Sequence, residues 1–209
     1  MPNEQIDNVL NTIKAIIEKE KHHRENYSQG QRATLFTSWI TPVDNLPYNV
    51  VRVSNFNQAF ADELIDEIFR FIDQEGDINE DRIVVGPGFC FGGSSAIQIA
   101  TRKGERLAGI ITAYGSLVGE YSDPSTDNWG SFDESSGPVL VIGGELDTNP
   151  APEELRAFGE ALSQRNIDNQ VLIYEGVSHA FINPEDIESD PTSAAAQAWQ
   201  EILSFTHRV

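Results

Sequence analysis

The single cysteine of the chain, Cys90, lies between glycines in the segment DRIVVGPGFCFGGSSAIQIA, residues 81–100. An apolar run typical of a buried strand precedes it, and a helix-forming run follows it. Side chains larger than hydrogen two residues away would collide in a sharp strand-to-helix turn, so Gly88 and Gly92 favour that turn. The pattern is G-x-nucleophile-x-G, with cysteine where many hydrolases carry serine. Cys90 is therefore a candidate nucleophile.

The predicted turn also gives Cys90 a favourable electrostatic setting. It places the thiol at the N-terminus of a helix, whose positive end favours the thiolate. It leaves the backbone N–H of Phe91 free to donate a hydrogen bond to an oxyanion. Phe91 is therefore the candidate oxyanion-hole residue.

Two further polar residues follow predicted strands. Asp147 comes after strand 139–142, and His179 comes after strand 170–174. Parallel α/β sheets hold their sites outside the carboxyl ends of the strands. The chain order nucleophile, acid, histidine is that of the α/β-hydrolase fold, in which the histidine moves the proton and the acid holds its tautomer. Each residue alone is more often structural, but together in this order they favour a Cys90–Asp147–His179 triad.

Strands and helices alternate from residue 82 onward. Short apolar runs predict buried strands, and longer runs with one apolar stripe predict helices. The predicted strands are 82–85, 107–113, 139–142 and 170–174, and the predicted helices are 94–102, 152–164 and 193–205. This alternation is typical of an α/β fold, with a parallel sheet covered by helices on both faces. The stretch 119–137 is its one long connection, of a kind that often carries function.

The first part of the chain has a different pattern. Residues 5–25 carry one apolar stripe and predict an amphipathic helix that ends near His22 and His23. Adjacent side chains point about 100° apart on a helix, so this pair is interpreted as a solvated helix end and not as a metal site. Residues 33–53 predict a strand, a turn and another extended piece, and residues 57–74 predict a second helix.

Three blocks of the sequence resemble the dienelactone hydrolase family. They are GFCFGG at 88–93, GGELD at 143–147 and SHAF at 178–181, and the resemblance covers residues 57–206. It implies an α/β-hydrolase three-layer sandwich with a mostly parallel sheet and helices on both faces. It also implies hydrolysis of a carboxylic ester, thioester or lactone by the matching triad residues, through a thioester on Cys90 and with no metal ion or cofactor.

The sequence departs from the family in two respects. Family members begin with further strands, one of which precedes a His-Glu loop that supplies a second oxyanion N–H, and no such segment precedes residue 57. We therefore expect early strands to be missing. Trp39–Tyr48 is a candidate to form the wall of the site that the missing loop would otherwise provide. Losing one oxyanion donor costs roughly 100- to 1000-fold in rate. Enzymes of the family that act on carboxylated lactones also have an arginine soon after the histidine, where this chain has INPE at 182–185.

The composition excludes several classes of protein. With 33 acidic and 14 basic side chains, the formal net charge is −19, which disfavours nucleic acid and anionic membranes as partners. No Lys or Arg lies between Arg106 and Arg156, although the gap contains many acidic residues. This stretch is either a solvated acidic surface or an edge that rejects anionic ligands. We expect a neutral ester, thioester or lactone as substrate.

The cysteine count and the N-terminus indicate the compartment. One cysteine excludes an internal disulfide and hence a disulfide-stapled secreted fold. The N-terminus lacks the pattern of a secretory leader, and no apolar run approaches the roughly 18 residues that span a bilayer. We expect a cytoplasmic protein with one domain over residues 1–209, composed of a divergent segment, 1–56, and a family-like catalytic part, 57–209.

Two alternative functions remain open at this point. Class I glutamine amidotransferases also place a cysteine at a Gly-x-Cys-x-Gly turn, but they follow their histidine with an acid two residues on, whereas Ala180 and Phe181 follow His179. The other alternative is a catalytically weak or inactive hydrolase-like domain that binds a partner. A sheet without its first strands has an edge that the N-terminal helix or a second chain must cover, so both a monomer and a homodimer are consistent with the sequence.

Overall fold

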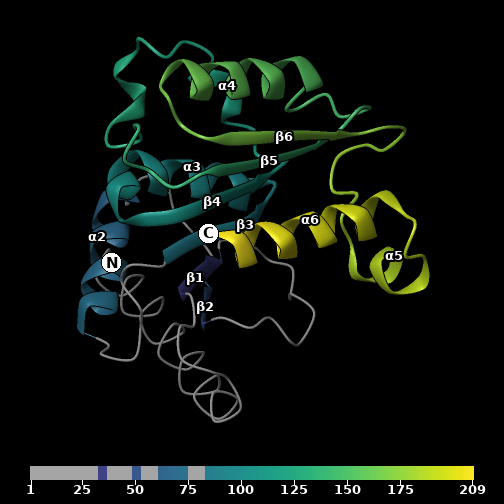
Figure 1. Cartoon of the computed structure of the whole chain (residues 1–209), viewed down its shortest axis with the longest axis horizontal. Coiled ribbons are helices and arrows are strands. Elements are labelled where there is room, and N and C mark those ends of the chain that lie inside the picture. The colour runs from purple at the N-terminus through teal and green to yellow at the C-terminus, as the bar shows by residue number, and fades with distance from the viewer. Residues whose placement is uncertain (1–32, 37–48, 53–60, 75–82) are drawn as a thin grey trace, which may run out of the picture.

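A computed structural model describes residues 33–36, 49–52, 61–74 and 83–209 (Figure 1). Six strands in these residues form one sheet in the order β2-β1-β3-β4-β5-β6, and every neighbouring pair is parallel. The strands are β1 (Ala33–Phe36), β2 (Asn49–Arg52), β3 (Ile83–Phe89), β4 (Leu107–Ala113), β5 (Val139–Gly144) and β6 (Asn169–Tyr174). A parallel sheet brings the carboxyl ends of its strands to one edge, so the loops that follow them meet there.

Helices cover both faces of this sheet. The α-helices are α2 (Ala61–Gln74), α3 (Phe91–Lys103), α4 (Pro152–Gln164), α5 (Pro184–Ser189) and α6 (Ala194–Arg208), and the short 3₁₀ helices are η3 (Gly104–Arg106), η4 (Val118–Tyr121) and η5 (Asp127–Trp129). Helices α2, α3 and α4 share one hydrophobic core with the sheet, and α6 packs on the opposite face (Figure 1). The result is the three-layer α/β sandwich that the sequence predicts.

Alternate residues of each central strand enter different cores. Ile83 and Val85 of β3 lie with α2, α3 and α4, whereas Val84 lies with α6. Ile110 and Ile111 of β4 divide in the same way. Strands buried on both faces need apolar side chains at successive positions, which explains why they are nearly continuous apolar runs in the sequence.

The elements predicted from residue 82 onward are confirmed in type and order. Strand β4 and helix α4 have the predicted bounds, and α6 runs to Arg208. Helix α3 begins at Phe91, before its predicted start at 94, and the six-residue helix α5 is not among the predicted elements. The predicted helix 5–25, with His22 and His23, lies outside the described residues.

The segment 33–53 supplies two strands of the sheet. Strand β1 pairs with both β2 and β3, and Leu35 lies opposite Val85. The predicted strand and extended piece are therefore present as β1 and β2. The expectation that early strands are missing does not hold for these two strands. Residues 37–48 lie outside the described residues, so the role of Trp39–Tyr48 as a wall stays a prediction.

The long connection 119–137 contributes to the core. Its Trp129 and Phe132 are fully buried, with exposed fractions of 1% and 0%. The guanidinium of Arg165, at the end of α4, lies 4.9 Å from the centre of the Trp129 ring and donates a hydrogen bond to the carbonyl oxygen of Pro124 (2.6 Å). The connection therefore packs against α4 as a structural part of this face.

Candidate active site

Cys90 lies at the turn between β3 and α3, and its side chain is exposed. Its φ is 52° and its ψ is −117°, a conformation that residues other than glycine rarely adopt. Its backbone N–H donates to the carbonyl oxygen of Ala113 on β4 (2.9 Å), and its carbonyl accepts from the N–H groups of Gly93 and Ser94 (2.9 and 3.2 Å). These hydrogen bonds hold the strained turn, so the thiol stands at the carboxyl edge of the sheet.

Glycines permit the close approaches that the turn requires. A Cβ atom on Gly88 would collide with the backbone of Gly92, and one on Gly93 would press on Thr112 and Ala113 of β4. Helix α3 therefore starts directly against β4, at a distance that only glycine allows. The sequence pattern points to Gly88 and Gly92, and the structure adds Gly93 for this packing reason.

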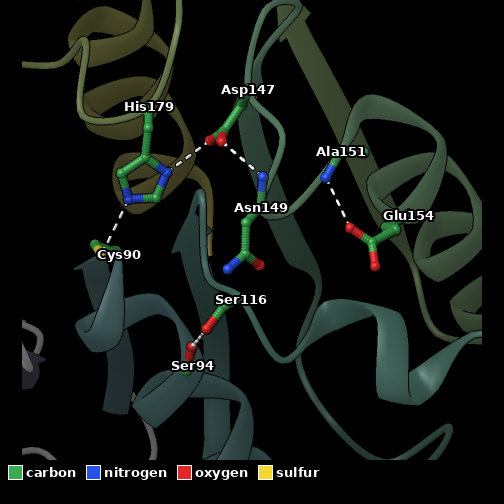
Figure 2. Close-up of polar contacts among 8 residues, drawn as sticks. All are labelled: Cys90, Ser94, Ser116, Asp147, Asn149, Ala151, Glu154 and His179. Carbon is green, nitrogen blue, oxygen red and sulfur yellow. Dashed lines mark hydrogen bonds and ion pairs between the residues drawn. The ribbon is translucent and has the colours of Figure 1, made fainter.

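The structure brings the three predicted triad residues together (Figure 2). Nε2 of His179 lies 3.0 Å from Sγ of Cys90, and Nδ1 of His179 lies 2.7 Å from Oδ2 of Asp147. The loops after β3, β5 and β6 each supply one of the three side chains. Residues that are far apart in the sequence therefore meet at the carboxyl edge of the sheet, as expected for parallel strands.

The neighbours of the His179 ring determine where its proton lies. A carboxylate only accepts hydrogen bonds, so Nδ1 carries the proton and donates a hydrogen bond to Asp147. Nε2 then presents its lone pair to the thiol of Cys90, which is the arrangement of a general base. The side chain of Asp147 is 3% exposed, and its Oδ1 accepts a second hydrogen bond from the backbone N–H of Asn149 (2.9 Å). Both carboxylate oxygens are therefore engaged, which holds the acid in one orientation.

Phe91 is the first residue of α3, directly after Cys90. The N–H groups in the first turn of a helix have no partner within the helix, so the Phe91 N–H is available to a ligand beside the sulfur atom. This position agrees with the expected oxyanion donor.

Tyr114 is a residue of the site that the sequence analysis missed. It follows β4 directly, with an exposed fraction of 1%, and its ring stands edge-on to the ring of His179 at a centroid distance of 5.0 Å. Burial raises the pKa of the Tyr114 phenol above its ordinary value, and the electrostatic influence of Cys90 raises it further. The phenol is therefore neutral at physiological pH. The signal that could have revealed it is its place immediately after a central strand, next to the strand that Cys90 follows.

The surroundings of the triad offer apolar contacts. In the part of the chain that the structure describes, the large hydrophobic side chains that are exposed are Phe91 (42%) and Leu146 (60%), each next to a triad residue in the sequence. Ile182, in the segment after His179, is buried. Among the described residues, no three His, Cys, Asp or Glu side chains gather where they could hold a metal ion. The absence of metal and cofactor from the chemistry stays a prediction.

The dienelactone hydrolase family profile matches residues 52–209. The chain belongs to the dienelactone hydrolase family. This confirms the resemblance that three sequence blocks carry. The match includes the predicted family-like part, 57–209, whereas the single-domain organisation of residues 1–209 stays a prediction.

Two curated relatives of this dienelactone hydrolase family member carry the same name. A protein of Yersinia pestis with the provisional name carboxymethylenebutenolidase is 29% identical over 126 residues, which are 56% of this chain and 44% of that protein. A protein of Saccharolobus solfataricus with the same provisional name is 31% identical over 126 residues, 60% of this chain and 44% of that protein. The match thus spans less than half the length of these relatives.

Solved structures show the same fold. A carboxylesterase from Lactobacillus plantarum superposes with a TM-score of 0.63 at 13% identity, over 88% of both chains. A dienelactone hydrolase-like promiscuous phosphotriesterase from metagenomic libraries superposes with a TM-score of 0.61 at 17% identity, also over 88% of both chains. These likenesses confirm the α/β-hydrolase-like fold. None of the helices in the described ranges is both long and apolar enough to cross a membrane.

Proposed function

We propose that this member of the dienelactone hydrolase family hydrolyses a neutral carboxylic ester, thioester or lactone, with Cys90 as nucleophile, His179 as base and acid, and Asp147 as orienting acid. The observation that carries the proposal is the continuous relay from sulfur to carboxylate, with contacts of 3.0 and 2.7 Å. The strained backbone at Cys90 supports it, because strain of this kind persists where a side chain must be held in place for function.

The first half of the reaction acylates Cys90. Nε2 of His179 takes the proton of the thiol as Sγ attacks the carbonyl carbon of the substrate. The carbonyl oxygen becomes an oxyanion, which accepts a hydrogen bond from the Phe91 N–H. The carbon–oxygen bond of the ester then breaks, and the departing alkoxide takes the proton from His179. The products are the alcohol and a thioester on Cys90.

The second half returns the enzyme to its resting state. His179 takes a proton from water as the oxygen of that water attacks the thioester carbon. The tetrahedral intermediate collapses, the carbon–sulfur bond breaks, and the sulfur regains its proton from His179. The acid product is released. Asp147 accepts the Nδ1–H hydrogen bond throughout and stabilises the imidazolium in both halves.

Charge and exposure support an uncharged substrate. No Lys or Arg occurs between Arg106 and Arg156, and residues 182–185 carry none after the catalytic histidine. A substrate carboxylate would therefore lack the cation that family members acting on carboxylated lactones use. The exposed side chains of Phe91 and Leu146 can contact apolar parts of a neutral substrate.

The direct test compares the wild type, Cys90→Ala and Cys90→Ser with p-nitrophenyl acetate and p-nitrophenyl butyrate. Because loss of a nucleophile removes the covalent route, Cys90→Ala is expected to lower kcat at least about 10³-fold. Intact mass spectrometry of the wild type during turnover should find an acyl group on the protein, and none on Cys90→Ala. Ser178→Ala is the matched control, since it alters an exposed side chain beside His179.

Two outcomes would count against the proposal. Equal turnover by the wild type and Cys90→Ala would remove Cys90 from the mechanism. Fast labelling of Cys90 by iodoacetamide without turnover of any ester would favour the non-catalytic binding domain. Because Cys90 is the one cysteine of the chain, the labelling reports on this thiol alone.

A further inference from the structure

Tyr114 occupies the position after β4 that Cys90 occupies after β3. Its φ is 43°, in the left-handed region, and its backbone N–H donates to the carbonyl oxygen of Ile142 on β5 (2.7 Å). The adjacent carbonyl, that of Ala113, accepts the N–H of Cys90 (2.9 Å). A non-glycine residue in this region costs roughly 1–3 kcal/mol, so the surrounding structure must impose it. The backbone thus directs the side chain of Tyr114 toward the triad.

The ring of Tyr114 packs against the loop that carries the catalytic histidine. Its centroid lies 5.0 Å from that of His179, with the planes at 60°, and 5.9 Å from that of Phe181, with the planes at 58°. Its other aromatic neighbour is Phe89, at 6.0 Å, which is the last residue before Cys90. One buried ring therefore touches the segments on either side of the contact between sulfur and imidazole.

The hydroxyl group of Tyr114 is buried as well. It has no hydrogen bond of ordinary geometry to a described residue, and it lies beside the backbone of Ile182. Burial first, and then the electrostatic influence of Cys90, raise the pKa of this phenol, so it keeps its proton near neutral pH. Tyr114 is for this reason no candidate for an acid or a base, and its influence must act through the position of His179.

The contacts of His179 change during the proposed reaction, on which this inference rests. In the resting enzyme, Asp147 and Cys90 hold the two ring nitrogens. Once sulfur is bound in a thioester, it has no proton to share, and the contact at Nε2 is lost. The ring then keeps one polar anchor, Asp147, about which it can turn. Water must nevertheless meet Nε2 in the correct place for the second half of the reaction.

We propose that Tyr114 is a positioning residue whose ring holds the imidazole of His179 in its working orientation while Cys90 is acylated. The contact is edge-on and apolar, so acylation of the sulfur atom does not alter it. The role is therefore greatest in deacylation, when the contact between sulfur and Nε2 is missing.

The test uses the full chain with Tyr114→Phe, Tyr114→Met and Tyr114→Leu, and p-nitrophenyl acetate as substrate. Because misplacement of a catalytic group costs up to about 100-fold, the Met and Leu variants are expected to deacylate about tenfold more slowly. Their kcat and KM should fall together, while kcat/KM, which reports acylation, changes less than about threefold. Intact mass spectrometry should find more acyl-enzyme at steady state. Tyr114→Phe keeps the ring and should resemble the wild type.

Tyr121→Leu is the matched control, because Tyr121 is also a buried tyrosine but belongs to the opposite core with Trp129 and Phe158. It should lower the unfolding temperature without changing the acyl-enzyme fraction. If Tyr114→Leu does not fold, Tyr114→Met carries the test, since Met fills irregular space. The inference would be overturned if Tyr114→Met had the kcat and acyl-enzyme fraction of the wild type. It would also be overturned if Tyr114→Phe lost as much kcat as Tyr114→Met. Absence of acyl-enzyme in the wild type would instead contradict the proposed function.

Discussion

Strain and hydrogen bonding oppose each other at Cys90. Its left-handed φ of 52° costs roughly 1–3 kcal/mol, and the backbone hydrogen bonds to Ala113, Gly93 and Ser94 offset that cost. The same hydrogen bonds fix the direction of the thiol. His179 is likewise held by groups in the segments that follow other strands, namely Asp147 after β5 and the ring of Tyr114 after β4. Each reacting group thus has its orientation set by a neighbour that does not itself react.

Asp147→Asn tests this view at a single residue. An amide nitrogen facing Nδ1 of His179 donates a hydrogen bond, so the proton of the imidazole moves to Nε2, where it can no longer accept the thiol proton. We expect kcat for p-nitrophenyl acetate to fall on the order of 10²- to 10⁴-fold, with KM little changed.

The control for this change is Asp168→Asn, which makes the same substitution at an exposed position just before β6, at the amino end of the strand. It should turn over the ester at the wild-type rate. A wild-type kcat in Asp147→Asn would show that the carboxylate does not orient the base.

Helix α3 and the connection 119–137 show how tertiary contacts override local signals. Gly92 and Gly93 disfavour a helix by about 1 kcal/mol each, which is why the predicted helix starts after them. The helix nevertheless begins at Phe91, because a glycine at position 93 leaves room for the first turn to lie against β4. The connection is polar in sequence, yet its few aromatic residues, Trp129 among them, are in the core. Its Ser- and Asp-rich turns serve to bring those aromatics to α4.

Arg165→Met tests the attachment of this connection to α4. The change removes a cation–π contact with Trp129 and a hydrogen bond to the carbonyl oxygen of Pro124. We expect a loss of about 1–3 kcal/mol in the free energy of unfolding, measured by urea denaturation. Arg156→Met, also on α4, is the control, because Arg156 is 57% exposed and its nearest carboxylate oxygen, on Glu153, is 3.9 Å away. Equal effects of the two substitutions would mean that the contact with Trp129 adds no stability.

On the proposed function, the charge of the whole molecule affects which substrates reach the site. The net charge of −19 produces a negative field that repels anions, and its range falls as salt screens it. The sequence has no Lys or Arg between Arg106 and Arg156 and none at 182–185, and these two features act in the same direction as the net charge. We therefore expect a neutral substrate to be preferred over an anionic one.

A pair of esters of similar length, p-nitrophenyl pentanoate and the monoanionic p-nitrophenyl succinate, tests this effect. At low salt the anion should have the lower kcat/KM. Raising the ionic strength from about 0.01 M to about 1 M shortens the Debye length from about 30 Å to about 3 Å, so the difference should narrow through faster turnover of the anion. The neutral ester is the control, and its kcat/KM should change little with salt. An anion preferred at low salt would contradict the prediction.

The sequence alone determined the type and order of the elements from residue 82 onward, because burial on both faces makes each strand a continuous apolar run and each helix an apolar stripe. It also determined the triad candidates, since Cys90, Asp147 and His179 each follow a strand and parallel strands end at one edge. The short helix α5 escaped prediction because six residues carry too little periodic signal.

Only the tertiary structure decided which atoms meet. The contact between Sγ and Nε2 joins residues 89 positions apart, and its length depends on loop conformations that no local pattern specifies. The sequence did not indicate Tyr114 as part of the site for the same reason. Its ring contacts that of His179, which lies in a different loop. The place of β1 beside β3 is likewise a property of the assembled sheet. Local pattern selects the elements, whereas contacts between distant segments arise from packing alone.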